Sequence, residues 1–255
     1  MITRKLVPFG TTVFAEMTAL AQERDAINLA QGFPDFEGPE EIVEAAVRAL
    51  RSGSNQYART RGHPPLVEAI AEAQKRYYGL AYDPMTEILV FSGATEGIAA
   101  SLLGLLNPGD EVILFQPFYD SYPPGLAMAQ AVPRFLTLPF PDFSLDEGAL
   151  RDLVTDRTRM ILLNTPMNPT GKVFSEDDLE IIASVCRDHD LIAVTDEVYE
   201  HLTFDGARHV PLASLPEMRD RTLTMSSAGE TYSFTGWKIG WGAGPATITG
   251  GAPAA

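Results

Sequence analysis

The sequence predicts an α/β fold, with a mainly parallel sheet flanked by helices. From about residue 39 onward, short apolar runs alternate with segments whose apolar residues recur every three or four positions. The runs are continuously apolar and only weakly alternating, as in strands that are covered on both faces. Regular alternation of such strands with helices is typical of a parallel sheet.

The pattern also assigns individual elements. Five short apolar runs are expected to form strands: 87–91, 111–115, 159–163, 191–195 and 222–225. Helical spacing predicts helices over 39–51, 64–77, 94–106 and 175–188. The last of these opens with Ser175 and has Asp178 three positions later, an acidic variant of the capping box. Cys186 falls on the apolar stripe of this helix, so we expect it in the core.

Composition and charge narrow the class of protein. The 255 residues include 45% hydrophobic and 21% charged side chains, which is the balance of a globular protein. The formal charge of −15, from 34 acidic and 19 basic residues, argues against binding of nucleic acid. The single cysteine cannot form an intramolecular disulfide. We see no targeting signal and no apolar stretch of about 18 to 20 residues, so we expect a cytoplasmic protein without a membrane partner.

Chemically distinctive residues follow the predicted strands, and ligand sites of α/β sheets lie at the carboxyl ends of strands. Segment 92–97 places small residues at a helix start, where backbone N–H groups can bind a phosphate. An ordinary helix start without a ligand explains the same residues. Segment 116–122 contains aromatic side chains that can either stack on a planar ring or pack beneath the loop.

Two further loops present polar side chains. In 164–171, two prolines and a glycine predict a rigid turn that presents the Asn168 amide, and a purely structural turn accounts for them equally well. Asp196 and Tyr199 follow the predicted strand 191–195. A carboxylate in that place either caps a helix or holds a protonated ring nitrogen, the partner that an electron-sink pyridinium requires.

Five motifs, in order along the chain, resemble one enzyme family. They are AQGFPDF (30–36), NQY (55–57), NTPMNPTGK (164–172), TDEVYEHL (195–202) and SSAGETYSFTGWKIGW (226–241). Together they resemble the class I aminotransferases of pyridoxal-phosphate fold type I, and among these the kynurenine/glutamine and succinyldiaminopimelate aminotransferases. The resemblance implies the large domain of that fold, an α/β/α sandwich. It also implies transfer of an amino group between an amino acid and a 2-oxo acid.

Taken position by position, the resemblance implies where a cofactor and a substrate bind. Pyridoxal 5'-phosphate would be held through its phosphate and its ring, and the substrate through its carboxylate. For the phosphate, the implied groups are Ala94, Thr95, Ser227, Lys238 and, from a partner subunit, Tyr57. For the ring, they are Tyr119 as the stacking group, Asp196 at the nitrogen, and Asn168 and Tyr199 at the hydroxyl. For the substrate, they are Gly32 and Asn168 at the carboxylate and Phe14 along the pocket wall.

The sequence departs from the family pattern at the catalytic position. The family motif S-x-G-K ends in the lysine that forms the internal Schiff base, and Glu230 stands at that position. A carboxylate cannot form an imine with an aldehyde. We therefore expect pyridoxal phosphate, or pyridoxamine phosphate, to bind without a covalent bond. Lys238 is no substitute, because it matches the separate phosphate-binding residue.

The second departure is at the C-terminal end. After Gly242 the chain runs through small residues, whereas family members continue into the rest of the large domain and a small domain with a carboxylate-binding arginine. We expect a chain truncated at its C-terminus. An N-terminal arm with a small-domain segment would span 1–38, and an incomplete large domain 39–255. Because the family is dimeric, we also expect a homodimer.

Three interpretations of the function stay open. The first is an aminotransferase by descent that is impaired or inactive because Glu230 replaces the lysine. The second is an enzyme that uses pyridoxamine phosphate, with Glu230 as the proton-transfer base. The third is a non-catalytic pseudoenzyme or a decayed, truncated product, which the small-residue tail 250–255 would suit.

Overall fold

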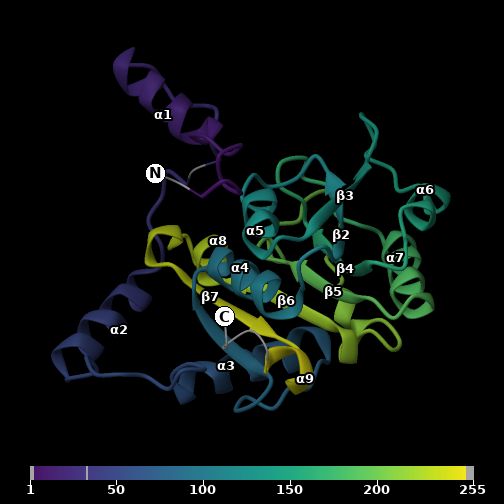
Figure 1. The fold of residues 1–255 in the computed structure, drawn as a ribbon. Helices are drawn as coiled ribbons and strands as arrows, with labels where there is room; N and C mark the ends of the chain where they lie inside the picture. Colours follow the sequence, from purple (N-terminus) through teal and green to yellow (C-terminus); the bar gives the residue numbers. More distant parts are fainter. Residues whose placement is uncertain (1–2, 33, 251–255) are drawn as a thin grey trace.

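The computed structural model describes residues 3–32 and 34–250, and within them a seven-stranded sheet forms the centre (Figure 1). The strand order is β1-β7-β6-β5-β4-β2-β3. The strands are Ile88–Ser92 (β1), Glu111–Gln116 (β2), Val132–Thr137 (β3), Thr158–Asn164 (β4), Ile192–Asp196 (β5), Thr222–Ser227 (β6) and Ile239–Ala243 (β7). Strands β2 to β6 are parallel, whereas β7 runs antiparallel to its neighbours β1 and β6. The predicted mainly parallel sheet is confirmed.

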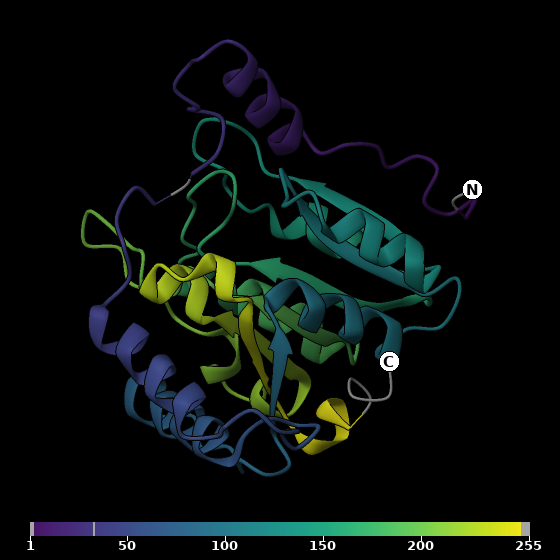
Figure 2. The ribbon, with the colours of Figure 1, turned by 90° about the vertical axis from the view of Figure 1, so that its left-hand side faces the viewer.

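Helices cover both faces of this sheet and give the expected α/β/α layers (Figures 1 and 2). The helices are Val13–Glu23 (α1), Glu40–Arg51 (α2), Pro64–Tyr78 (α3), Ala94–Leu105 (α4), Tyr122–Ala129 (α5), Glu147–Asp152 (α6), Glu176–Asp188 (α7), Ala228–Tyr232 (α8) and Ala246–Thr249 (α9). Short 3-10 turns span Leu212–Ser214, Arg219–Arg221 and Thr235–Trp237. Apolar side chains of α4 and α5 pack on one face of the sheet, and those of α6 and α7 pack on the other.

Successive side chains of the central strands enter opposite layers of the core. In β2, Val112 and Leu114 pack with α4 and α5, whereas Ile113 and Phe115 pack with α6 and α7. Both faces of the strand are therefore buried, which explains why its sequence is continuously apolar. Cys186 of α7 is fully buried in the second of these clusters, as predicted.

The five predicted strands and four predicted helices are all present, with bounds within two residues of those expected. The capping box also forms, since Ser175 Oγ accepts a hydrogen bond from Asp178 N at 3.1 Å. The apolar pattern does not predict β3 and β7. Strand β3 lies at the edge of the sheet and contains Pro133 and Arg134, and β7 is interrupted by two glycines.

A glycine in β7 permits a close approach to helix α4. A Cβ atom at Gly240 would lie 2.4 Å from Ala94 N, so a side chain there would displace the start of the helix. In β6, Ser227 is paired with Gly240. The fold thus brings the segment 226–241 against the first turn of α4, where the sequence predicts a phosphate site.

The N-terminal helices stand apart from the layers. Neither α1 nor α2 has a buried residue in the described structure, and Figure 2 shows α1 beyond the sheet. The singled-out tail residues 251–255 lie outside the described residues, as does Phe33 of the AQGFPDF motif. In the described part of the chain, no helix has the length and apolar character needed to cross a membrane.

Candidate functional site

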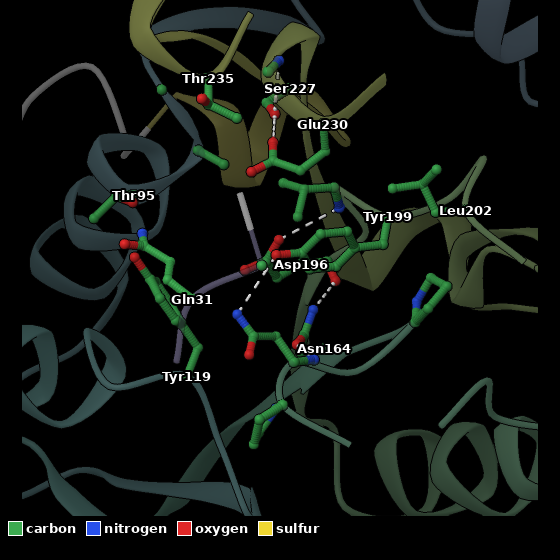
Figure 3. A pocket seen from close by; sticks show the side chains of 18 of the residues that line it. Gln31, Thr95, Tyr119, Asn164, Asp196, Tyr199, Leu202, Ser227, Glu230 and Thr235 are labelled. Carbon is green, nitrogen blue, oxygen red and sulfur yellow. Dashed lines mark hydrogen bonds between the residues drawn. The ribbon is translucent and has the colours of Figure 1, made fainter. Parts of the chain in front are cut away.

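A cavity of about 1120 Å³ lies at the carboxyl ends of β4, β5 and β6 (Figure 3). This is the edge at which α/β sheets bind ligands. The predicted site residues that line it are Phe14, Gly32, Ala94, Thr95, Tyr119, Asn168, Asp196, Tyr199, Ser227, Glu230 and Lys238. Tyr57 is not among the lining residues and is fully exposed. Its role toward a partner subunit stays a prediction.

One end of the cavity is suited to an anion. Helix α4 begins after Gly93, which has a φ of +88°, and no side chain caps the first N–H groups of the helix. These N–H groups and the positive end of the helix dipole attract negative charge. An added Cβ at Gly93 would lie 3.5 Å from Lys238 Cδ, so the lysine side chain passes beside the helix start. Ser227, paired with Gly240 next to Ala94, adds a hydroxyl.

A buried carboxylate marks another wall of the cavity. Asp196 Oδ2 accepts a hydrogen bond of 2.7 Å from the hydroxyl of Tyr122, and both side chains are buried. The pKa of Asp196 is raised to about 6, chiefly by burial, and the negative charges of Glu230 and Glu197 contribute to the increase. The hydrogen bond from Tyr122 acts in the opposite direction because it stabilises the carboxylate. A carboxylate in such a place pairs strongly with a cationic N–H.

The turn after β4 aligns amide groups with this carboxylate. Asn164 Nδ2 donates to Asp196 O at 2.8 Å, and Asn164 Oδ1 accepts from Asn168 N at 2.6 Å. Asn164 and Asp196 are register partners in the parallel pair of β4 and β5. Asn168 Nδ2 lies 3.5 Å from the Tyr199 hydroxyl, to which it donates. Hydrogen bonds therefore join the turn to the strand that carries Asp196, and Asn168 lies beside Tyr199. The roles of Asn168 and Tyr199 toward a ring stay predictions.

Sequence reasoning missed Tyr122 and Asn164 as site residues. Both lie within segments that the sequence singled out, yet neither matches a family motif position with an assigned role. Asn164 is the last residue of β4, so the strand-end rule that selected Asp196 applies to it as well. Tyr122 lies in the first turn of α5, three residues after Tyr119, with the two rings edge to face at 5.6 Å. Its contact with Asp196 depends on the tertiary fold and has no local signal.

Glu230 projects into the same cavity from the first turn of α8. Ser227 Oγ donates to Glu230 Oε2 at 2.5 Å, and the side chain is half-buried (Figure 3). The negative charge of Glu230 influences the pKa of other groups that line the cavity. Burial raises the pKa of Tyr199 to about 12, and the negative charge of Glu230 is the next largest cause. Glu230 therefore contributes negative potential to the space that Asp196 and Tyr199 face.

We predict that Tyr122→Phe raises the pKa of Asp196 further, by about one pH unit, because the carboxylate loses a buried hydrogen bond. Carbon-13 NMR of labelled aspartate carboxyls measures the midpoint, and Asp196→Asn identifies the signal. Tyr119→Phe is the matched control, since its hydroxyl does not bond to Asp196. An unchanged midpoint in Tyr122→Phe would contradict the role assigned to Tyr122.

This donor set fits a phosphorylated heteroaromatic ring. Uncapped N–H groups, a hydroxyl and an ammonium suit a phosphate, and the buried Asp196 suits a protonated ring nitrogen. Among the described residues that line the cavity, Lys238 is the one lysine or arginine. Among these described lining residues, an aldehyde thus meets no side-chain amine other than that of Lys238, at the proposed phosphate end.

Comparisons with known proteins agree on one family. The family model for aminotransferase class I and II matches residues 24–252. A probable N-succinyldiaminopimelate aminotransferase of Mycobacterium tuberculosis is 52% identical over 259 residues, covering 100% of this chain and 65% of the relative. The methionine aminotransferase of Escherichia coli is 41% identical, covering 96% of this chain and 64% of its own length.

A solved structure shows the same fold. The three-dimensional structure of N-succinyldiaminopimelate aminotransferase from Mycobacterium tuberculosis matches with a TM-score of 0.97 at 51% identity. The match covers 100% of this chain and 67% of the solved one. The chain thus spans about two thirds of the length of the relatives that it matches.

Proposed function

The chain belongs to the aminotransferase class I and II family, and from this membership we propose that its cavity binds pyridoxal phosphate. The observation that supports the proposal is the pairing of two features in one cavity: an uncapped helix start beside Lys238, and the buried Asp196. The first suits the phosphate and the second suits the ring nitrogen. In the whole protein, the proposed reaction is transfer of an amino group between an amino acid and a 2-oxo acid.

Individual residues have distinct roles in this proposal. The N–H groups of Ala94 and Thr95, with Ser227 and Lys238, bind the phosphate. Tyr119 stacks on the ring, Asp196 keeps the ring nitrogen protonated, and Asn168 and Tyr199 bind the ring hydroxyl. Gly32 and Asn168 hold the substrate carboxylate, with Phe14 along the wall. We also propose a cytoplasmic homodimer in which Tyr57 reaches the partner's site.

The bound group would supply an aldehyde that accepts the amino group and a ring that withdraws electrons from the substrate. The chain's own part is to orient that ring, exclude water and move a proton. Glu230 stands where the family resemblance expects the lysine that binds the cofactor and moves that proton. We therefore propose that this chain has little or no transaminase activity and binds pyridoxal phosphate reversibly.

A non-catalytic product and an enzyme that uses Glu230 as a base are the alternatives. The Glu230 carboxylate is held in the cavity by Ser227, which is compatible with a base. A product without any function predicts no ligand binding at all. Absence of saturable cofactor binding would therefore contradict the first two interpretations, whereas saturable binding is also compatible with a non-catalytic pseudoenzyme.

Titration of the chain with pyridoxal phosphate, followed by quenching of tryptophan fluorescence, tests the proposal. We expect saturable binding that Lys238→Gln weakens about tenfold, because a charge-assisted contact to the phosphate is lost. Lys75→Gln, an exposed lysine of α3, is the matched control and should bind like the unaltered chain. Absence of saturable binding would contradict the cofactor site. An equal Kd for Lys238→Gln and the control would contradict the phosphate assignment.

A further inference from the structure

Two carboxylates face the cavity from neighbouring elements. Asp196 ends β5, and Glu230 lies in the first turn of α8, directly after β6 (Figure 3). Strands β5 and β6 are adjacent in the sheet, so both side chains arrive at the same edge. Asp196, Tyr199 and Glu230 line the same cavity. The negative charge of Glu230 accordingly raises the pKa of both other groups.

A hydrogen bond from Ser227 orients the side chain of Glu230. Ser227 Oγ donates to Glu230 Oε2 at 2.5 Å, and Ser227 itself is buried at the end of β6. This hydrogen bond engages one carboxylate oxygen and keeps the group at the wall of the cavity (Figure 3). The hydroxyl of Ser227 has one proton, so a phosphate that accepts it in the proposed complex leaves Glu230 Oε2 at the cavity wall, free to accept a hydrogen bond from an ammonium.

The charges that line the cavity are unequally distributed. In the described residues, the charged side chains of its wall are Glu96, Asp196, Glu230 and Lys238. Lys238 passes beside Gly93 at the helix start, where it would contact the phosphate of the proposed cofactor. Glu96 is engaged by the backbone N–H of Ser92. In the described structure, the region between Asp196 and Glu230 thus has two carboxylates and no cationic side chain.

Such a region favours a ligand that brings a positive charge. Opposite charges a few Å apart attract strongly where water is partly excluded, and an ammonium can donate to a carboxylate and a tyrosine hydroxyl together. A neutral hydroxyl of the same size gains much less. An aldehyde gains no hydrogen bond from a carboxylate, because both groups are acceptors.

We propose that Glu230 makes the cavity a site for a primary ammonium, so that the chain binds the amine form of the cofactor, pyridoxamine phosphate, in preference to its alcohol and aldehyde forms. This inference rests on the proposed function, since it assumes that the phosphorylated ring enters the cavity. Glu230 acts as a specificity residue: it selects the state of the cofactor through charge. The selection concerns binding, and it requires no chemical step.

Two ligands that differ in one group test the inference. Pyridoxamine phosphate and pyridoxine phosphate share the ring and the phosphate and differ only as aminomethyl and hydroxymethyl. Isothermal titration calorimetry at pH 7.5 and low salt gives the ratio of their Kd values. We expect the unaltered chain to bind pyridoxamine phosphate at least about tenfold more tightly, and Glu230→Gln to reduce the ratio to about threefold or less.

The glutamine variant keeps the size and the acceptor for Ser227 and removes only the charge. Glu68→Gln, at an exposed position of α3 outside the cavity, controls for the net charge of the chain and should keep the full ratio. Equal binding of the two ligands by the unaltered chain would overturn the inference while leaving the cofactor site intact. A ratio that survives in Glu230→Gln would also overturn it. Failure of both ligands to bind any variant would contradict the proposed function itself.

Discussion

Glu230→Lys is expected to convert reversible binding of pyridoxal phosphate into covalent attachment. The substitution places an amine at the cavity wall, next to Ser227 and facing Asp196. It also removes the negative charge that raises the pKa of Asp196, so the carboxylate is more fully ionised and pairs better with a ring nitrogen. We expect a new absorbance band and, after borohydride reduction, one pyridoxyl group per chain. Turnover is expected to stay weak.

Peptide mapping of the reduced variant locates the modified residue. The prediction requires the pyridoxyl group at position 230, and Glu230→Gln serves as the control that should form no adduct. A Glu230→Lys chain that is folded and binds the cofactor, yet forms no adduct, would refute the assignment of position 230. An adduct at Lys238 in both variants would refute it equally.

Asp196→Asn is expected to weaken pyridoxal phosphate binding by about 10-fold to 100-fold at neutral pH, because a buried charge-assisted hydrogen bond is lost. The carboxylate that pairs with the ring nitrogen is the ionised form, and the pKa of Asp196 in the free protein is about 6. Affinity should therefore increase as the pH rises through about 6. Asp196→Asn should lose this part of the pH dependence.

The raised pKa of Asp196 also makes the free energy of unfolding depend on pH. The folded-state pKa of Asp196 lies above the ordinary value of an aspartate, so the folded chain favours the protonated carboxyl. The contribution of the protonated Asp196 carboxyl to the free energy of unfolding is fully present below about pH 4. It is lost as the pH rises through about 6. Ligand titrations and urea unfolding between pH 4 and 8, on the unaltered chain and on Asp196→Asn, measure both effects. The phosphate of the ligand also titrates in this range, and the asparagine variant subtracts it. Identical pH profiles for the two proteins would contradict the assignment of Asp196.

Most of the strands that the sequence predicts are buried on both faces. Strands β2, β4 and β5 are covered on both faces, so their apolar runs are visible in the sequence. Strand β7 is glycine-rich because Gly240 packs against the backbone of α4, and its contact partner is more than 140 positions away in the chain. Local patterns contain no information on such an approach. The register of β7 between β1 and β6 therefore had to come from the structure.

In the candidate site, too, some features are visible in the local sequence and others depend on the tertiary fold. Asp196 stands at the end of β5 and could be selected by that position, whereas Asn168 lies in the turn after β4 and is indicated by the prolines and the glycine of that turn. Tyr122 binds Asp196 across 74 positions of sequence, and the sequence presents it only as an aromatic residue near a helix start. Glu230 and Asp196 line the same cavity because β5 and β6 are adjacent in the sheet, and local sequence does not predict this adjacency. The sequence therefore predicts which kinds of side chain form the site, but not how these side chains lie relative to one another.

The central claim is that this cavity binds pyridoxal phosphate without a covalent bond, because Glu230 stands where an amine is required. The most direct measurement is the intact mass of the unaltered chain after incubation with pyridoxal phosphate and borohydride, together with a binding titration. We predict saturable binding and an unmodified mass. A stoichiometric pyridoxyl adduct on the unaltered chain would contradict the claim, since some lysine of the chain would then do the work assigned to the missing one.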